Sequence, residues 1–465
     1  MTLQKYCDLV MKGGITSGIV YPNAVLALAR TFRFKNIGGT SAGAIAAAVT
    51  AAAALGDRRQ QVADAAAGAG ARGFRGMEQV ARQLASQGFI SSLFQPASGA
   101  RNAYRVIVTL AGPAGLPRKV LSVVCGAVLI APFEFLGILA LWLGVGYVVG
   151  AATGMLAALL PALLCAYMGA GFFAALRVAR VARGNLLGLC SGRATGNTPA
   201  LTDWLHTVLQ ELSGKPLDAP LTFCDLHEAP RYAGEPLSAR AINLQVITTS
   251  VSHREPRTLP FAHAHFWFQR EEFDALFPKV VVDWLVQRAG TPVHDDGRAY
   301  YRLPPGEHLP VLVATRMSLS FPLLISAVPL HEPRGPVRAP QHTVQAPEHD
   351  VSASTEGLTT GGEAESLHAC SFQRCWFTDG GVASNFPIHL FDEPLPKWPT
   401  FAINLAYPKD DRPPAVDEAT RIEESIFIAA ENNQGWQRSW NGFGKRIAAL
   451  ELAGFLFAII ATMQN

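Results

Sequence analysis

The sequence predicts an α/β domain with a mainly parallel central sheet, interrupted by an inserted pair of apolar helices. Before residue 116, short apolar runs alternate with helical patterns, which is typical of a parallel sheet covered by helices. Between residues 120 and 176 the only charged residue is Glu134, and this stretch is long enough for two membrane spans of roughly 20 residues each. The chain has 465 residues, of which 49% are hydrophobic, so it can build a large buried core.

The elements of the α/β domain follow from the residue pattern on each side of the apolar insertion. Before it, we predict strands at 7–11 and 32–37 and helices at 21–30 and 42–55. After it, we predict helices at 200–212 and 271–289, and strands at 241–249, 311–315, 375–378 and 400–406. Residues 331–366 are rich in Pro, Gly, Thr, His and Glu without periodicity, so we expect a disordered or mobile loop there.

These patterns divide the chain into four segments. Residues 1–115 form the first part of the α/β domain, 116–183 form the apolar helical hairpin, 184–430 complete the domain, and 431–465 form an amphipathic or apolar C-terminal segment. Within that last segment, the apolar stretch 447–463 is interrupted by Glu451, which favours an interfacial or core helix over a third span. The N-terminus lacks the pattern of a secretory signal and is expected to form the first strand.

The apolar hairpin has basic residues on both sides, which favours a cytoplasmic location for its two ends. The basic residues are Arg101, Arg105, Arg118 and Lys119 before the hairpin, and Arg177, Arg180 and Arg183 after it. We expect a bend within 144–154. Glu134 is either a functional polar group or, as we favour, a carboxyl that lies near the membrane interface or is neutral. A very hydrophobic pair of buried core helices is the alternative, although no polar stripe is visible. We therefore expect an integral membrane protein whose α/β domain is cytoplasmic.

Charge and cysteine content exclude several classes of partner and cofactor. A net charge of +3 without a long basic run argues against nucleic-acid binding. The seven cysteines are scattered, without CxxC pairs or zinc-ligand spacing, so we predict reduced thiols, no metal and no cofactor. His263 and His265 form an HxH pair, but no third ligand follows at suitable spacing. The sequence leaves the oligomeric state open.

A candidate nucleophile lies in the sequence Gly39-Thr40-Ser41-Ala42-Gly43. This GxSxG pattern follows an apolar strand and precedes an alanine-rich helix, as in a nucleophile elbow. The sharp turn would project the Ser41 hydroxyl above the sheet, where Gly39 and Gly43 avoid side-chain clashes. The alternative is that Ser41 only caps the following helix.

Two further elements could complete an acyl-transfer site. Asp379 follows a predicted strand and precedes Gly380 and Gly381, so its carboxylate would emerge at the strand end and could take the proton of Ser41. Taken alone, Asp-Gly-Gly would indicate a hairpin turn. The glycine-rich loop at 13–18 follows the first strand and could present backbone N–H groups to an oxyanion. It could also bind phosphate, although the usual nucleotide-binding patterns are absent.

In this order, the glycine-rich loop, GTSAG and DGG resemble the patatin-like phospholipase family. The segments 314–322 (ATRMSLSFP) and 379–387 (DGGVASNFP) also resemble that family, and the similarity covers residues 5–55 and about 200–410 but not the hairpin. The resemblance implies a three-layer α/β fold and a Ser41–Asp379 dyad that hydrolyses acyl esters of membrane lipids. It also implies an oxyanion hole at Gly13, Gly14 and Ile15, although the loop departs from the family's usual GGGxRG.

Three alternatives remain open at the level of sequence. His253 or His389 could complete a conventional triad with Ser41. The protein could be a non-enzymatic lipid-binding or scaffold module on the membrane. It could also be an esterase or thioesterase that acts on a soluble acyl group rather than on a membrane lipid.

Overall fold

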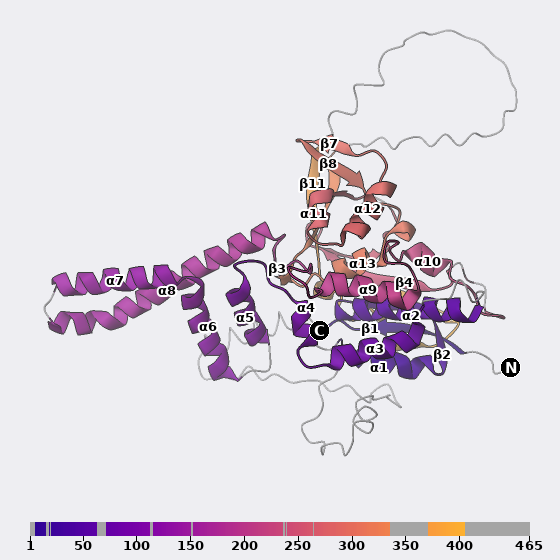
Figure 1. Ribbon diagram of the computed structural model, residues 1–465, viewed down its shortest axis with the longest axis horizontal. Helices are drawn as coiled ribbons and strands as arrows, with labels where there is room; N and C mark the ends of the chain where they lie inside the picture. The colour runs from indigo at the N-terminus through magenta and orange to yellow at the C-terminus, as the bar shows by residue number, and fades with distance from the viewer. Residues whose placement is uncertain are drawn as a thin grey trace, which may run out of the picture.

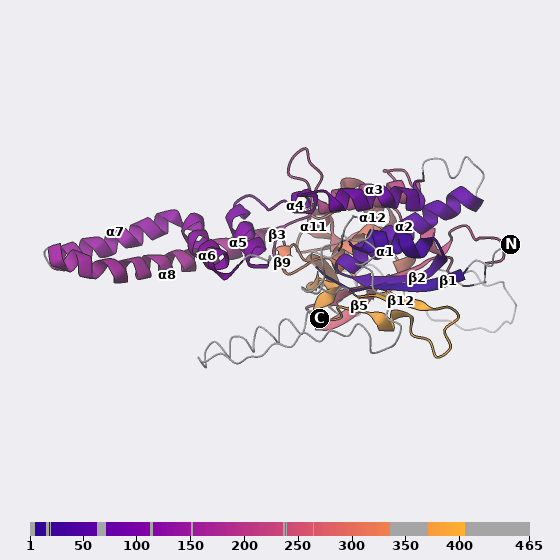
Figure 2. The same cartoon turned by 90° about the horizontal axis from the view of Figure 1, so that it is seen from below.

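The computed structural model describes residues 5–14, 18, 20–62, 71–111, 115–149, 152–235, 238, 240–263, 265–334 and 371–404. Within these residues, an α/β body carries a long helical arm that projects away from it (Figures 1 and 2). The predicted segment at 447–463 lies outside the described residues, as does most of the predicted loop at 331–366. Its first four residues belong to a strand, because β10 (Val328–Arg334) continues through Arg334.

A ten-stranded sheet forms the centre of the described body. In order across the sheet, its strands are β12 (Thr400–Ile403), β1 (Lys5–Met11), β2 (Phe32–Thr40), β4 (Asn243–Ser250), β11 (Ser371–Thr378), β10, β6 (Trp267–Gln269), β8 (Arg298–Arg302) and β7 (Val293–Asp295), with β5 (Glu255–Leu259) paired to β4. A second, two-stranded sheet pairs β3 (Gly188–Cys190) with β9 (Leu323–Ile325).

The sheet changes character at β4. Strands β12, β1, β2 and β4 are parallel, whereas β11, β10, β6, β8 and β7 continue the sheet through antiparallel pairs. Of the parallel strands, β1 and β2 are those that the alternation of strands and helices before residue 116 predicts. The Asp296-Gly297 turn, with φ of 47° and 72°, allows the tight antiparallel connection between β7 and β8.

Helices cover the parallel part of the sheet and bury its apolar side chains. The helices α1 (Val20–Ala29), α2 (Ala42–Val62) and α3 (Gly73–Ala85) lie on one face of β1 and β2 (Figure 2). Helix α9 (Leu201–Ser213) packs beside α2 and α3. Alanine makes up much of the buried part of α2, and this small side chain lets the helix pack closely against the sheet and its neighbours.

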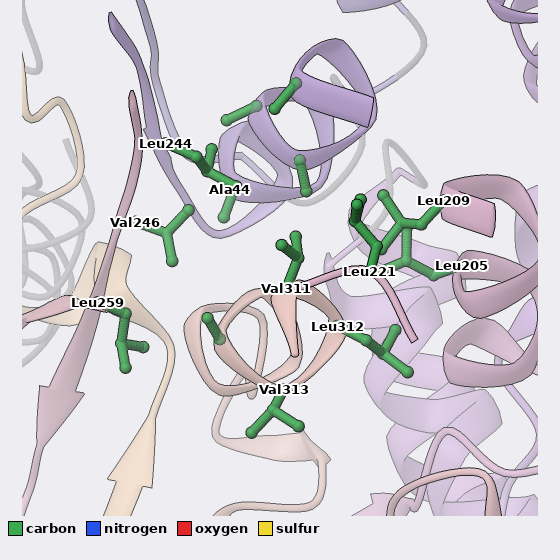
Figure 3. Packing of buried hydrophobic residues seen from close by; sticks show 14 of the residues in the cluster. Ala44, Leu205, Leu209, Leu221, Leu244, Val246, Leu259, Val311, Leu312 and Val313 are labelled. Carbon is green, nitrogen blue, oxygen red and sulfur yellow. The ribbon is translucent and has the colours of Figure 1, made fainter. Parts of the chain in front are cut away.

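The predicted strand at 311–315 is wrong, because these residues begin helix α13 (Val311–Ser318). Every residue of α13 is buried, and Figure 3 shows Val311, Leu312 and Val313 pointing in different directions into the core. A short apolar run without a polar face has the same composition in a buried strand and in a buried helix. Pro310 directly precedes the helix, in keeping with the preference of proline for helix starts.

The predicted helix at 271–289 is divided into two. Helices α11 (Arg270–Asp274) and α12 (Lys279–Arg288) are separated at Pro278, whose ring cannot continue a helix interior. Between the major helices lie the short elements α4 (Phe89–Leu93) and α10 (Phe223–His227). The remaining predicted strands and helices match the structure, with ends that differ by a few residues, apart from α2, which runs seven residues beyond its predicted end.

The apolar insertion contains three helices rather than the two of a simple hairpin. Helix α6 (Leu116–Ile130) packs against α5 (Arg101–Ala111), and the chain then bends by 87° into α7 (Pro132–Val149). Helix α8 (Ala152–Gly184) runs back beside α7, so the reversal falls within the predicted bend at 144–154 (Figure 1). Among the described helices, Leu159–Gly184 is long and apolar enough to cross a membrane, and the bent pair of α6 and α7 passes the same test jointly.

Small side chains hold α7 and α8 together, while large apolar side chains face outward. Ala162, Ala166, Ala170 and Ala174 recur every four residues on α8 and are buried. The outward side chains include Phe133, Leu136, Leu141, Tyr147, Val148, Leu160, Leu164, Met168 and Phe172. Near the base of the arm, Arg177 donates to the Glu134 carboxylate at 2.5 Å and to the Ile130 carbonyl at 2.5 Å. Glu134 is therefore paired with a cation.

Candidate active site

Ser41 occupies a sharp turn between a central strand and a buried helix. Strand β2 ends at Thr40, α2 begins at Ala42, and Ser41 between them has a φ of 55°, which is unusual for a residue other than glycine. A Cβ on Gly39 would collide with the backbone of Gly43, and one on Gly43 would collide with the β1 end at Met11. The two glycines therefore permit the strained turn that the GxSxG pattern predicts.

Asp379 lies at the end of β11 and is directed at this turn. Its Oδ1 accepts the Gly381 N–H at 2.7 Å. The Thr249 hydroxyl donates to the Asp379 carbonyl at 2.9 Å, and the Ser320 carbonyl accepts the Asp379 N–H at 2.9 Å. The Ser41 hydroxyl is close enough to lower the pKa of the carboxyl by hydrogen bonding. The other carboxylate oxygen, Oδ2, is buried and makes no hydrogen bond of regular geometry within the described residues. The structure thus brings Ser41 and Asp379 together.

Burial controls the protonation of Asp379. The side chain is 2% exposed, and loss of hydration raises its pKa to about 6, while the Ser41 hydroxyl and the Gly381 N–H oppose this shift. A carboxylate with a raised pKa is a stronger base than an ordinary aspartate and is still ionised at neutral pH.

The end of α13 and the residues directly after it connect the two groups, although the roles of their side chains were not predicted. The Ser318 hydroxyl accepts the Ser41 N–H at 3.1 Å and donates to the Ile247 carbonyl of β4 at 2.5 Å. The Ser320 carbonyl accepts the Asp379 N–H at 2.9 Å. Only the resemblance of residues 314–322 to a family motif pointed to this segment, because no local pattern shows that two serines hold the turn and the strand end.

Arg316 lies beneath this segment and is fully buried. Its guanidinium donates to the Ser320 hydroxyl at 2.5 Å and to the carbonyls of Ser191 and Ser326 at 2.9 and 3.0 Å. Burial lowers the pKa of Arg316 to about 9. The hydrogen bonds tie the Ser320 loop to β3 and the β9 end, and so position the backbone that holds Asp379.

The glycine-rich loop lies beside Ser41, but one predicted oxyanion donor is engaged elsewhere. A Cβ on Gly13 would lie 3.1 Å from the Ser41 Cβ, so the loop adjoins the hydroxyl. The Gly13 N–H donates to the Asn385 carbonyl at 2.8 Å, which contradicts its predicted role as a free donor. Gly14 has no such acceptor among the described residues, and Ile15 lies outside them. Sequence alone cannot show which amide of a loop is already bonded.

An apolar pocket begins next to Ser41. Ala42 and Leu319 line it near the turn, and it continues along α2 past Ile45, Ala46 and Val49. Helices α1, α3, α4 and α9 supply the other walls, including Tyr21, Val25, Met77, Val80, Leu93 and Trp204. The pocket holds about 730 Å³ of space, part of it open to solvent. Its lining suits a hydrocarbon chain better than a polar ligand.

Comparison with known proteins found a family model, a curated relative and a solved structure that match the chain. The family model for patatin-like phospholipases matches residues 9–392. The chain belongs to the patatin-like phospholipase family. It is 56% identical over 481 residues to a protein called RpoH suppressor from Rhizobium meliloti (strain 1021), covering 100% of this chain and 75% of that protein. The crystal structure of VipD from Legionella pneumophila matches with a TM-score of 0.28 and 13% identity, over 83% of this chain and 48% of VipD. This chain thus spans about half the length of VipD.

Family membership makes this patatin-like phospholipase a lipid acyl hydrolase and confirms the predicted α/β fold class. The sequence singles out four histidines, His253 and His389 for a triad and His263 and His265 as an HxH pair. His253 is bonded to Ser250 at 2.8 Å and to Glu332 at 3.1 Å. His263 and His265 are exposed, and their rings lie 5.6 Å apart. No hydrogen bond joins His389 to Ser41 within the described residues.

Proposed function

We propose that this lipid acyl hydrolase cleaves fatty-acyl esters of membrane phospholipids or related lipids through a Ser41–Asp379 dyad. The observation that best supports this proposal is the strained Ser41 turn, which adjoins both a buried carboxylate of raised pKa and an apolar pocket. A nucleophile, a base and space for an acyl chain are the three requirements of such a reaction.

In the proposed first half-reaction, Ser41 Oγ attacks the ester carbonyl carbon and its proton passes to Asp379. The tetrahedral intermediate collapses, Asp379 returns the proton to the departing alcohol, and the acyl group remains on Ser41. Water then attacks the acyl-enzyme while Asp379 accepts a proton from it. Collapse releases the fatty acid and restores the Ser41 hydroxyl, so one water is consumed for each ester cleaved.

We propose the backbone N–H groups of Gly14 and Ala42 as donors to the oxyanion. Ala42 directly follows Ser41, and in comparable elbows the amide after the nucleophile serves this purpose. The N-terminus of α2 also places positive partial charge there. Gly13 keeps a spacing role in this proposal, because any larger residue would collide with the Asn385 side chain and crowd Ser41.

The pocket along α2 is the proposed site of the acyl chain. Val49 lies eight residues beyond Ser41, or about 12 Å along the helix, so it should contact the far part of a long chain. We expect Val49→Phe to reduce kcat/KM for long-chain esters about tenfold or more, with a much smaller effect on short-chain esters. The measurement is the ratio of kcat/KM for long and short acyl esters. An equal loss for both would show that the chain binds elsewhere.

The helical arm is the proposed membrane anchor. Helix α7 has 18 residues, or about 27 Å, which is close to the thickness of a bilayer core. The exposed side chains along the arm are apolar, whereas the Glu134–Arg177 pair lies near its base, next to the body. Arg180 and Arg183 continue the basic end of α8. This distribution favours a body on the cytoplasmic side, where the tethered site has a high local concentration of lipid.

Charges placed on the arm should disrupt membrane insertion. Leu141 and Leu160 are 67% and 78% exposed, near the middle of α7 and on the facing part of α8. We expect the double variant Leu141→Arg, Leu160→Arg to lose resistance to alkaline carbonate extraction, because each arginine costs about 3 kcal/mol at the centre of a span. Leu217→Arg, at a 58% exposed position on the body, is the matched control and should remain in membranes. Release of the wild-type protein by carbonate would contradict the proposal.

Mass spectrometry of total membrane lipids tests the substrate class. Wild-type protein should convert phospholipids to free fatty acids and lysolipids, whereas Ser41→Ala should leave the lipids unchanged. If only soluble thioesters or short esters are hydrolysed and membrane lipids remain intact, the substrate proposal is wrong.

A further inference from the structure

A second cluster of reactive side chains lies on the antiparallel half of the sheet. His253 is in the turn between β4 and β5, Glu332 is on β10, and Cys375 is on β11. The ligand atoms of these three residues all lie within 4.8 Å of one another. The first and last of the three residues are 122 positions apart in the sequence, so no short motif reveals the cluster. It belongs neither to the Ser41–Asp379 dyad nor to the acyl pocket.

The sheet register explains why the three side chains converge. Leu330 of β10 pairs with Cys375 of β11, and Glu332 pairs with Gln373. Glu332 and Cys375 therefore lie diagonally on one face, because side chains two apart on a strand share a face. Ser250 pairs with Phe377 on the same face, and the turn after Ser250 returns His253 toward the other two residues.

The geometry points to a binding site for a divalent transition metal, and we propose that His253, Glu332 and Cys375 bind Zn²⁺. Imidazole nitrogen, thiolate sulfur and carboxylate oxygen are the ligand types that zinc uses in proteins. The His253 Nε2 to Glu332 Oε2 distance is 3.1 Å, whereas two ligands in a tetrahedral zinc site lie about 3.3 Å apart. An ion equidistant from three atoms 4.8 Å apart would be about 2.8 Å from each, so shifts below about 1 Å would complete the bonds.

The surroundings of the cluster also suit a metal site. The buried Ser250 hydroxyl is hydrogen-bonded to His253 Nδ1 at 2.8 Å, which leaves Nε2 directed at the site. In many metal centres the ring nitrogen that does not bind the metal is held by such a hydrogen bond. Cys375 is 2% exposed, whereas the side chains of His253 and Glu332 are 29% and 20% exposed. The site is thus closed on the sulfur side and open to solvent on the other, where a water molecule could supply a fourth ligand.

Binding would join the β4–β5 turn to strands β10 and β11 close to the proposed base. The Cys375 thiol would release its proton to solvent as the sulfur–zinc bond forms, and the hydrogen bond between His253 and Glu332 would be replaced by two bonds to the ion. Cys375 lies four residues before Asp379 on β11, so the ion would fix the β4–β5 turn against β10 and β11 near that strand end. We therefore expect a structural zinc rather than one that contacts the ester.

Cobalt titration of the purified full-length protein tests the site directly. After treatment with a chelator, one equivalent of Co²⁺ should give the near-ultraviolet absorption of a cobalt–thiolate bond and the visible bands of a tetrahedral ion, and Zn²⁺ should displace it. Cys375→Ala should abolish the near-ultraviolet band, and His253→Ala or Glu332→Gln should weaken binding about tenfold or more. Cys224→Ala and His265→Ala are matched controls and should bind as the wild type does.

At one fixed zinc concentration, the Tm of the wild-type protein should also rise more than that of Glu332→Gln, because a ligand that binds only the folded state stabilises it, and tighter binding stabilises it more. This surface variant decides the question if Cys375→Ala does not fold. Absence of the thiolate band in the wild type, a band that survives Cys375→Ala, or a Tm shift that is undiminished in Glu332→Gln would overturn the proposal. Because both readouts are independent of ester hydrolysis, failure here leaves the proposed Ser41 chemistry unaffected.

Discussion

Replacing Ser41 with alanine is expected to lower kcat/KM for acyl-ester hydrolysis by a factor of about 10⁴ or more. The proposed reaction passes through an ester on the Ser41 oxygen, and no other side chain within the described part of the chain is placed to carry the acyl group. Loss of the nucleophile in other serine hydrolases has effects of this size or larger. The measurement is a comparison of wild-type and variant rates with a fluorogenic fatty-acyl ester in detergent micelles.

A serine elsewhere on the body provides the control for this substitution. Ser92 is exposed on α4 and takes no part in the proposed site, so Ser92→Ala should retain wild-type activity. Because the backbone at Ser41 is strained, with a φ of 55°, the fold of the alanine variant should also be compared with that of the wild type by circular dichroism. A folded Ser41→Ala protein with activity within tenfold of the wild type would exclude the covalent mechanism.

Asp379 is expected to give the reaction an acidic limb near pH 6. The proposed base must be ionised to accept a proton, and burial raises its pKa to about 6. The kcat/KM of the wild type should therefore be nearly constant above pH 7 and should fall about tenfold for each pH unit well below pH 6. Asp379→Asn should lose activity by a factor of about 10³ or more at every pH, because the amide cannot accept the proton.

The same raised pKa should lower the free energy of unfolding as pH rises, whereas it should raise the activity. The folded state retains a proton on Asp379 between about pH 4 and pH 6, where the unfolded chain has lost it, so folding becomes less favourable as pH rises through this window. The cost above pH 6 is on the order of 2–3 kcal/mol. Asp379→Asn should thus have a higher Tm than the wild type at pH 7, with a smaller difference at pH 4. A lower Tm for Asp379→Asn than for the wild type at pH 7 would show that the buried, ionised carboxylate does not destabilise the fold.

Much of the site could be predicted from local sequence because its chemistry depends on backbone turns. The glycines that flank Ser41 and follow Asp379 are needed at close approaches, and each cluster lies at the end of an apolar strand. The parallel strands β1 and β2 were predicted for the same reason, since each is a short apolar run next to a helical pattern. Local residue pattern and three-dimensional requirement coincide at these positions.

The features that sequence did not reveal depend on contacts between distant segments. The α13 residues have no polar face because every side of the helix is covered, so their pattern did not distinguish a helix from a strand. The hydrogen bond from Gly13 to Asn385 joins two loops 372 positions apart. The bend at Ala131 comes before Pro132, within an apolar run whose composition is the same on both sides. Neither a pairing partner nor a bend angle is encoded in residue periodicity.

The central claim is that Ser41 is an activated nucleophile, and labelling with a fluorophosphonate probe followed by peptide mass spectrometry tests it most directly. The account predicts one labelled serine, Ser41, with labelling that declines below pH 6 and is nearly lost in Asp379→Asn. Absence of labelling at neutral pH, or a modified serine other than Ser41, would contradict the account.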